Sequence, residues 1–174
     1  MTIAASPWSW RSAPPALRTL GRWVMAVQVV GYTVSLVFVW HTTRLVPDGV
    51  AARYRGTPAD TAATSTALQF PKSFSEMLTI THTHLLGLGA IFTITGLALA
   101  LCTRPSERWR RALIVEPFVA LLVSFCAMWM MRYLDARFSW LLELSSASLA
   151  VVFYIQSWYV WRELAILARE DARS

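Results

Sequence analysis

The chain has 174 residues, of which 56% are apolar and only 15% are charged, and its formal net charge is +6. Soluble domains contain about 45–50% apolar residues, so this composition excludes an ordinary soluble domain of the same length. The positive charge does not indicate nucleic-acid binding, because the arginines flank long uncharged segments. We therefore expect a membrane protein with no nucleic-acid partner.

Long apolar runs follow one another along the chain. Each is close to the roughly 20 residues that an α-helix needs to cross the hydrocarbon core of a bilayer. The predicted spans are at about 23–43, 77–103, 112–131 and 138–161. The rest of the chain divides into an N-terminal segment (1–22), an outer loop (44–76) and a C-terminal tail (166–174), around a bundle covering 23–165. The sequence thus predicts an all-α fold, an antiparallel four-helix bundle that is integral to the membrane.

The arginine distribution predicts the orientation of this bundle, because Lys and Arg concentrate on the cytoplasmic side of membrane spans. The turn between the second and third spans is the most basic, with four arginines within residues 104–111. Ten basic residues lie on the side of this turn and six lie on the opposite side. Both termini are therefore predicted to be cytoplasmic.

The second span has a recognisable start. Ser73 followed by Glu76 has the spacing of a capping box, in which each side chain bonds to the backbone N–H of the other residue. We therefore predict a helix that begins next to Ser73. The preceding segment 56–66 is small and polar and has no packing period, so we expect it to be mobile.

The three histidines are the candidate functional residues. His82 and His84 lie at the start of the second span and His41 at the end of the first, so all three fall in one layer near the outer face. An ionisable side chain at membrane depth is a functional candidate, because burying it without a partner is costly. His82 shares a helical stripe with Gly89 and Gly96, so we expect it to face the bundle interior. His84 lies about 200° around the helix, where we expect it to contact a partner or a ligand.

Three interpretations of this layer stay open. In the first, Arg132, Glu143 and Glu76 join the histidines in a structural polar cluster that holds the helices in register. In the second, His41 and His82 are the axial ligands of one haem b, which facing helices of a bundle commonly hold. In the third, the layer belongs to a proton or ion path, although the membrane centre of the chain is poor in polar residues. The sequence assigns no metal.

Several motifs resemble those of an uncharacterised family of small four-span bacterial inner-membrane proteins. They are Phe74-Ser75-Glu76, Thr81-His82-Thr83-His84-Leu85, Glu116-Pro117-Phe118 and the segment from Trp129 to Phe138. The similarity covers roughly residues 20–165, and its Thr-His-x-His element is the most specific part. Family members often carry an acidic residue where this chain has Ser124, which argues against a proton-carrying role. Because the family tends to occur in cytochrome-rich bacteria, the resemblance implies a multi-pass inner-membrane protein in an energy-metabolism context.

These observations favour a small integral membrane subunit of an electron-transfer complex, either respiratory or photosynthetic. We expect its role to be mainly structural, and we add the hypothesis that it binds one haem b near the outer face. Lipid and other membrane subunits are the predicted partners. The chain has no phosphate-binding loop, nucleophile elbow or zinc-protease signature, which favours an accessory role over an enzyme. Two alternatives remain: a stand-alone b-type cytochrome or quinol-linked carrier, and a transporter or proton-conducting protein.

Overall fold

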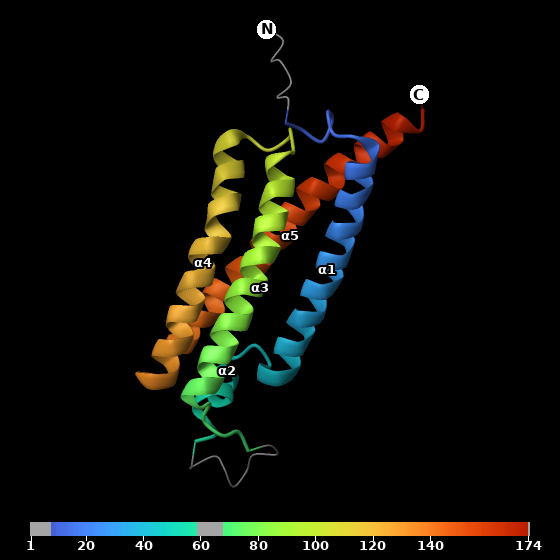
Figure 1. Ribbon diagram of the computed structural model, residues 1–174. Coiled ribbons are helices and arrows are strands. Elements are labelled where there is room, and N and C mark those ends of the chain that lie inside the picture. Colours follow the sequence, from blue (N-terminus) through green and yellow to red (C-terminus); the bar gives the residue numbers. More distant parts are fainter. Residues whose placement is uncertain (1–7, 59–67, 174) are drawn as a thin grey trace.

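A computed structural model describes residues 8–58 and 68–173 of the chain (Figure 1). Within these ranges the chain forms five helices: α1 (Pro15–Thr43), α2 (Pro47–Arg55), α3 (Phe74–Ala100), α4 (Glu107–Tyr133) and α5 (Phe138–Asp171). All except the short α2 are long and apolar enough to cross a membrane. The predicted all-α membrane bundle is thus confirmed.

The helices run alternately up and down (Figure 1). Residues 8–14, the α3–α4 turn and the end of α5 lie together at one end, which we call the arginine-rich end. Helix α2 and the α4–α5 turn lie at the other, which we call the α2 end. Both ends of the described chain therefore lie on the same side of the bundle. That this side is the cytoplasmic one stays a prediction.

The segment predicted as an outer loop contains α2. Pro47 occupies the first turn, where its missing N–H costs no helical hydrogen bond, and Gly56 ends the helix with a φ of 90°. Thr57 N donates to Gln69 O at 2.9 Å, which ties together the two ends of the connection between α2 and α3. Much of the segment expected to be mobile, residues 59–66, lies outside the described residues. At the other end of the chain, α5 continues to Asp171, well into the predicted C-terminal tail.

The predicted start of α3 is confirmed. Ser73 is the N-cap, its Oγ accepts a hydrogen bond from Glu76 N at 3.3 Å, and Ser73 N donates to Glu76 Oε2 at 2.8 Å. The other end of α3 is closed by a residue far away in the sequence. Trp10 is 3% exposed, its indole Nε1 donates to the Ala98 carbonyl at 2.8 Å, and its backbone N donates to Leu101 O at 3.0 Å. Because the last carbonyls of a helix lack helical donors, Trp10 acts as a tertiary cap.

Helices α4 and α5 form the most extensively packed pair, and three hydrogen bonds join them. One is partly buried, from Ser148 Oγ to Glu116 Oε1, and the other two are buried. Ser124 Oγ donates to Ser145 Oγ at 2.7 Å. Pro117 lies within α4 and lacks the N–H that a regular helix would offer to the Leu113 carbonyl. Gln156 of α5 is fully buried, and its Nε2 donates to that carbonyl at 2.6 Å. A side chain of α5 thus supplies the donor that the proline removes from α4.

Helix α1 is attached more loosely than the other spans. Only 11% of its most apolar window is buried, compared with 39% for α4. Its inward residues include Met25, which is 1% exposed, and Tyr32, whose ring stacks on Phe153 of α5 with 4.1 Å between centroids. Thr33 Oγ1 lies 2.8 Å from the Tyr154 hydroxyl and shares a hydrogen bond with it. The helix therefore lies at the periphery and presents most of its surface to the surroundings.

Candidate functional site

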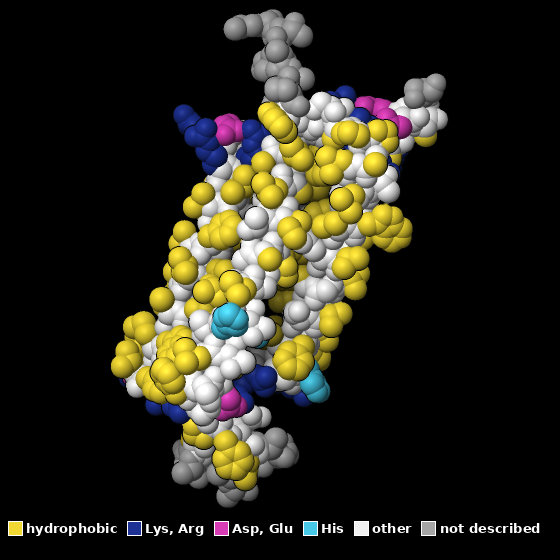
Figure 2. All heavy atoms as spheres, viewed as in Figure 1, with side chains coloured by type: hydrophobic (Ala, Val, Ile, Leu, Met, Phe, Trp, Pro, Cys, Tyr) yellow, Lys and Arg dark blue, Asp and Glu magenta, His cyan; other side chains and the backbone are white. Residues whose placement is uncertain are grey.

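The three histidines lie toward the α2 end of the bundle. His41 is in the last turn of α1, and His82 and His84 are about two and three turns after the start of α3. All three side chains are exposed in the isolated chain. Figure 2 shows histidine at two separate places on the surface, both in the lower half of the view.

The expectation that His82 faces the bundle interior is wrong. The side chain is exposed, and a Cβ added at Gly89 on the same stripe would meet no atom within 4 Å. Only Gly96, two turns further on, approaches another helix, with Ile114 of α4 at 3.9 Å. The glycine stripe points inward only near the arginine-rich end, because elsewhere larger side chains fill the interior face. The buried residues of α3 are Met77, Phe92, Thr95, Gly96, Ala98 and Leu99.

His84 has a defined ring orientation. Its Nδ1 lies 3.0 Å from the backbone carbonyl of Ile80, one turn earlier in α3. A carbonyl oxygen only accepts hydrogen bonds, so the neutral ring must carry its proton on Nδ1 to make this contact. Nε2 is then left as an unprotonated acceptor on an exposed side chain. That nitrogen can accept a hydrogen bond or coordinate a metal offered by another molecule.

An aromatic group of α3 and α4 lies beside these histidines. The Trp129 indole Nε1 donates to Thr81 Oγ1 at 2.9 Å. The same ring stacks with Tyr133, with 5.6 Å between ring centroids, and meets Phe74 edge-on, with 5.4 Å between centroids. Tyrosine and tryptophan gather where a membrane meets water, so this group marks the interface at the α2 end. The Thr-His-x-His element thus has two roles, since Thr81 ties α3 to α4 while His82 and His84 remain exposed.

The residues predicted to form a structural polar cluster make separate contacts. Arg132 Nε donates to the Lys72 carbonyl at 2.8 Å, and Glu76 caps α3 and pairs with Lys72 Nζ at 3.0 Å. Glu143 is half-buried, and its Oε1 makes no hydrogen bond with any described residue. Within residues 8–58 and 68–173, no hydrogen bond or ion pair joins Arg132, Glu76 and Glu143 to one another or to the histidines. Lys72, which the prediction omitted, links two of the three.

Sequence reasoning missed a second polar site, at the arginine-rich end. Glu163 of α5 is only 4% exposed, and its Oε1 accepts hydrogen bonds from Thr103 N at 3.2 Å and Thr103 Oγ1 at 2.6 Å. Burial, together with the nearby Glu163 carboxylate, raises the pKa of the Cys102 thiol to about 12. The sequence did contain an indication of this site, because Glu163 lies among apolar residues of α5. An acidic residue in such a segment is expected to be paired or to bind a ligand.

The described residues contain no group of three or more His, Cys, Asp or Glu side chains that could hold a metal ion. His41 and His82 also fit a haem poorly within the chain alone. Both imidazoles are exposed, and within one turn of either histidine only the partly buried Leu85 packs against a buried core cluster. A macrocycle between them would lie on the surface of the bundle rather than in its core.

The fold and these contacts define a multi-pass integral membrane protein. A family model described as a transmembrane helical domain matches residues 44–171, and the chain belongs to this family. The match covers α2 to α5, and so includes His82 and His84, whereas His41 and all of α1 precede it. No curated protein and no solved structure matches the chain.

Proposed function

We propose that the protein is a small, mainly structural subunit of a larger electron-transfer assembly in a bacterial inner membrane. In this proposal, His84 contacts a neighbouring subunit or a redox group held by that subunit. The observation that carries it is the exposed His84 side chain, whose Nδ1 is engaged with Ile80 O, so that the neutral ring keeps Nε2 as an open acceptor.

The depth of His84 supports a partner. His84 follows Phe74 by ten residues, which places it about 15 Å along the helix from that end. Its neighbour Thr81 already bonds to Trp129 of the interfacial aromatic group. The imidazole therefore lies at the inner edge of this group, where hydrocarbon offers no hydrogen-bond donor. An unsatisfied polar group there costs free energy, and a donor or metal from a partner would remove that cost.

The electron-transfer context rests on two further supports. Imidazole nitrogen is a common axial ligand of haem iron in membrane cytochromes. The Thr-His-x-His element also resembles one found in small inner-membrane proteins of cytochrome-rich bacteria. Together they favour a redox assembly over other membrane complexes as the partner of α3.

Photo-crosslinking in native membranes tests this proposal. A benzoylphenylalanine placed at His84 should crosslink to a defined subunit, which mass spectrometry would identify as part of a cytochrome-containing or reaction-centre complex. The matched control is Leu86, which is 62% exposed on the same helix and lies about 200° around it. Crosslinking to nothing from position 84, together with purification as a lone chain in mild detergent, would remove the proposal.

A stand-alone b-type cytochrome, with His41 and His82 as haem ligands, is the second candidate. Its support is that His41 on α1 and His82 on α3 lie toward the same end of the bundle. The exposure of both imidazoles argues against it, because a haem between them would lie on the surface of the chain. The purified wild-type chain should then show a Soret band and sharp reduced α and β bands. Replacing either His41 or His82 by alanine should abolish them, whereas His84→Ala should not. A colourless, folded chain that was expressed with ample haem would exclude this candidate.

We also propose that the arginine-rich end is cytoplasmic. Single cysteines at Ser106 and Ala136, both exposed in opposite turns of the bundle, test this. In a variant without the native Cys102 and Cys126, a membrane-impermeant thiol reagent should label Ala136→Cys in intact cells. Ser106→Cys should react only after permeabilisation. The reverse pattern would invert the orientation.

A further inference from the structure

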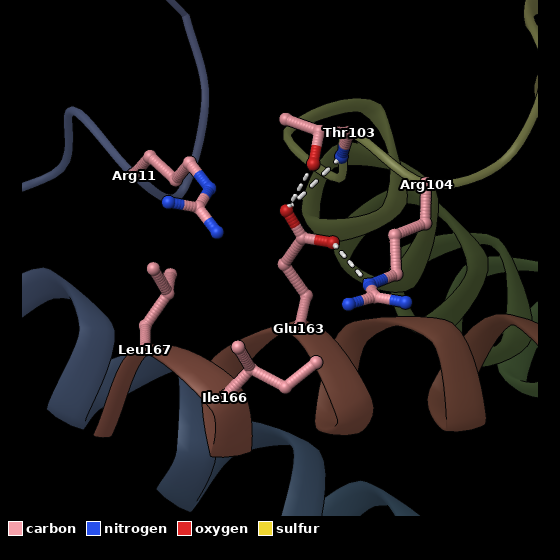
Figure 3. Close-up of a pocket in the computed structure, with 6 residues that line it drawn as sticks. All are labelled: Arg11, Thr103, Arg104, Glu163, Ile166 and Leu167. Atoms are coloured by element: carbon pink, nitrogen blue, oxygen red, sulfur yellow. Dashed lines mark hydrogen bonds and ion pairs between the residues drawn. The ribbon is translucent and has the colours of Figure 1, made fainter. Parts of the chain in front are cut away.

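A small pocket at the arginine-rich end, outside the histidine site, has the features of a ligand site. It has a volume of about 160 Å³ and lies between α5, the α3–α4 turn and the segment before α1 (Figure 3). Its lining residues are Arg11, Thr103, Arg104, Glu163, Ile166 and Leu167.

The carboxylate of Glu163 is the centre of this pocket, and its two oxygens differ. Oε1 accepts both hydrogen bonds from Thr103. Oε2 is buried and makes no hydrogen bond with any residue of the described ranges. The nearest cationic atom is Arg104 Nε at 3.9 Å, too far for a hydrogen bond. A buried carboxylate oxygen without a donor is costly, so this geometry suits a ligand that brings a donor to Oε2.

The surroundings of Glu163 define the rest of the ligand. In Figure 3, Arg11 lies on one side of the carboxylate and Arg104 on the other. Both arginine side chains are about half-exposed, at 52% for Arg11 and 44% for Arg104, and Arg11 also pairs with the exposed Glu170 at 3.2 Å. A ligand that enters between them must therefore present negative charge at the rim and a hydrogen-bond donor at the base. Ile166 and Leu167 add an apolar wall on α5.

We propose that this pocket binds the phosphoethanolamine headgroup of a membrane phospholipid. Its primary ammonium donates to Glu163 Oε2, its phosphate lies between Arg11 and Arg104, and its acyl chains continue along α5. The position fits a lipid, because basic pockets between helices at a membrane surface hold phospholipid headgroups. This inference does not depend on the histidine site or on the proposed function.

The chemistry distinguishes this headgroup from other common ones. A purely anionic headgroup, such as phosphatidylglycerol, would bring no cation to the buried carboxylate. A choline headgroup carries positive charge but has no N–H to donate to Oε2. A protonated amine beside a phosphate offers both a charged donor to the carboxylate at the base and an anion to the guanidinium groups at the rim.

Native mass spectrometry of the full chain in detergent can test the assignment with a graded lipid series. The probes are phosphatidylethanolamine, its N-monomethyl and N,N-dimethyl forms, phosphatidylcholine and phosphatidylglycerol. Retention should fall with each methyl group and be lowest for phosphatidylcholine, by about tenfold or more relative to phosphatidylethanolamine, since hydrogen bonds to charged groups are among the stronger ones. Equal retention of these two lipids, or stronger retention of phosphatidylglycerol, would overturn the proposal.

Variants link this preference to the pocket. Glu163→Gln keeps an oxygen that can accept from Thr103 but removes the charge, so its retention of phosphatidylethanolamine should fall to the phosphatidylcholine level. Asp48→Asn removes the same charge from the exposed first turn of α2, at the other end of the bundle, and should leave the preference unchanged. A folded Glu163→Gln protein with the wild-type preference would contradict the assignment.

Two further arms keep the test decisive. If Glu163→Gln does not fold, Arg104→Gln should weaken binding of all phosphate-bearing lipids in the series while keeping their order, and an unchanged affinity would overturn the proposal. Water-soluble glycerophosphoethanolamine separates a lipid from a free metabolite with the same headgroup. If it binds as tightly as the lipid, the source is not the membrane and the lipid assignment fails.

Discussion

Helix α1 and the α4–α5 pair are all long and apolar enough to cross a membrane, but they pack very differently. Helix α1 is about as apolar as α5, yet only 11% of its best membrane window is buried, compared with 28% for α5 and 39% for α4. Apolarity therefore decides that a helix enters the membrane but not how deeply it packs there. Lipid tails solvate apolar side chains as well as another helix does, so other interactions must select the partner.

Those other interactions are concentrated in the α4–α5 pair. Two buried hydrogen bonds join α4 to α5, one between serines and one from Gln156 to Leu113 O. The polar contacts from α1 to α5 are exposed: Thr33 shares a hydrogen bond with Tyr154, and Arg18 pairs with Asp171 at 2.9 Å at the arginine-rich end. The family match also begins after α1. We infer that α3, α4 and α5 form the framework of the domain and that α1 is an added, peripheral helix.

The largest expected effect comes from Phe153, where the two regions meet. Its side chain is fully buried, stacked on Tyr32 and edge-on to Phe92. Phe153→Ala should lower the free energy of unfolding by about 3–5 kcal/mol, through lost packing and the cavity that remains. Phe38→Ala on α1, where the side chain is 57% exposed, should cost less than about 1 kcal/mol. Unfolding in mixed micelles measures both, and equal losses would end the distinction between framework and periphery.

The next effect tests the polar contact inside the framework. Gln156→Leu leaves the Leu113 carbonyl without its donor and should cost about 1–3 kcal/mol. In a Pro117→Ala background the helix supplies its own N–H to that carbonyl, so the same substitution should cost less. A double-mutant cycle measures the difference. Additive losses would show that Gln156 does not compensate for the proline.

A glycine pair on α3 gives an intermediate effect. Gly96 is buried near Ile114 of α4, whereas Gly89 faces open space. Gly96→Leu should push α3 away from α4 and destabilise the bundle by about 1–3 kcal/mol. Gly89→Leu on the same helix should be tolerated, and detergent melting curves of the two variants provide the comparison. Equal tolerance would mean that α3 does not pack on α4 at this level.

The smallest effect is expected at the polar contact of α1. Thr33→Val removes the hydroxyl that shares a hydrogen bond with Tyr154 but keeps the side-chain shape. Hydrogen bonds between membrane helices average about 0.6 kcal/mol, so the loss should be of that order. The same unfolding assay applies, with Thr93→Val as the control because the Thr93 hydroxyl bonds only within α3. A loss as large as that for Gln156→Leu would place α1 in the framework.

The spans and the cap of α3 could be predicted because they depend on local signals. Length and apolarity indicate a span, and Ser73 with Glu76 makes a capping box from its own neighbours. The inward face of α3 could not be predicted in the same way. Lipid-facing and protein-facing surfaces are both apolar, so the glycine stripe did not distinguish the open side at Gly89 from the packed side at Gly96.

The remaining differences come from contacts between distant residues. Trp10 closes the end of α3 from 88 residues away, and the carboxylate of Glu163 is held by a threonine 60 residues earlier. No local pattern connects such pairs. The short helix α2 was missed for another reason: its Pro47, Asp48 and Gly49 are typical of a turn. Helix formation there uses the proline and the aspartate as first-turn residues instead.

The proline of α4 also fixes the register between two helices. In a regular helix the backbone hydrogen bonds are complete at every turn. A neighbouring helix held only by apolar side chains could therefore shift along it and pack in several alignments of similar energy. Pro117 exposes a single carbonyl in α4, and Gln156 can reach it in one alignment. A slip of one turn, about 5.4 Å, would leave both the amide and the carbonyl unpaired in a medium without water. The proline in α4 thus specifies which of several possible alignments of α4 and α5 the folded protein adopts.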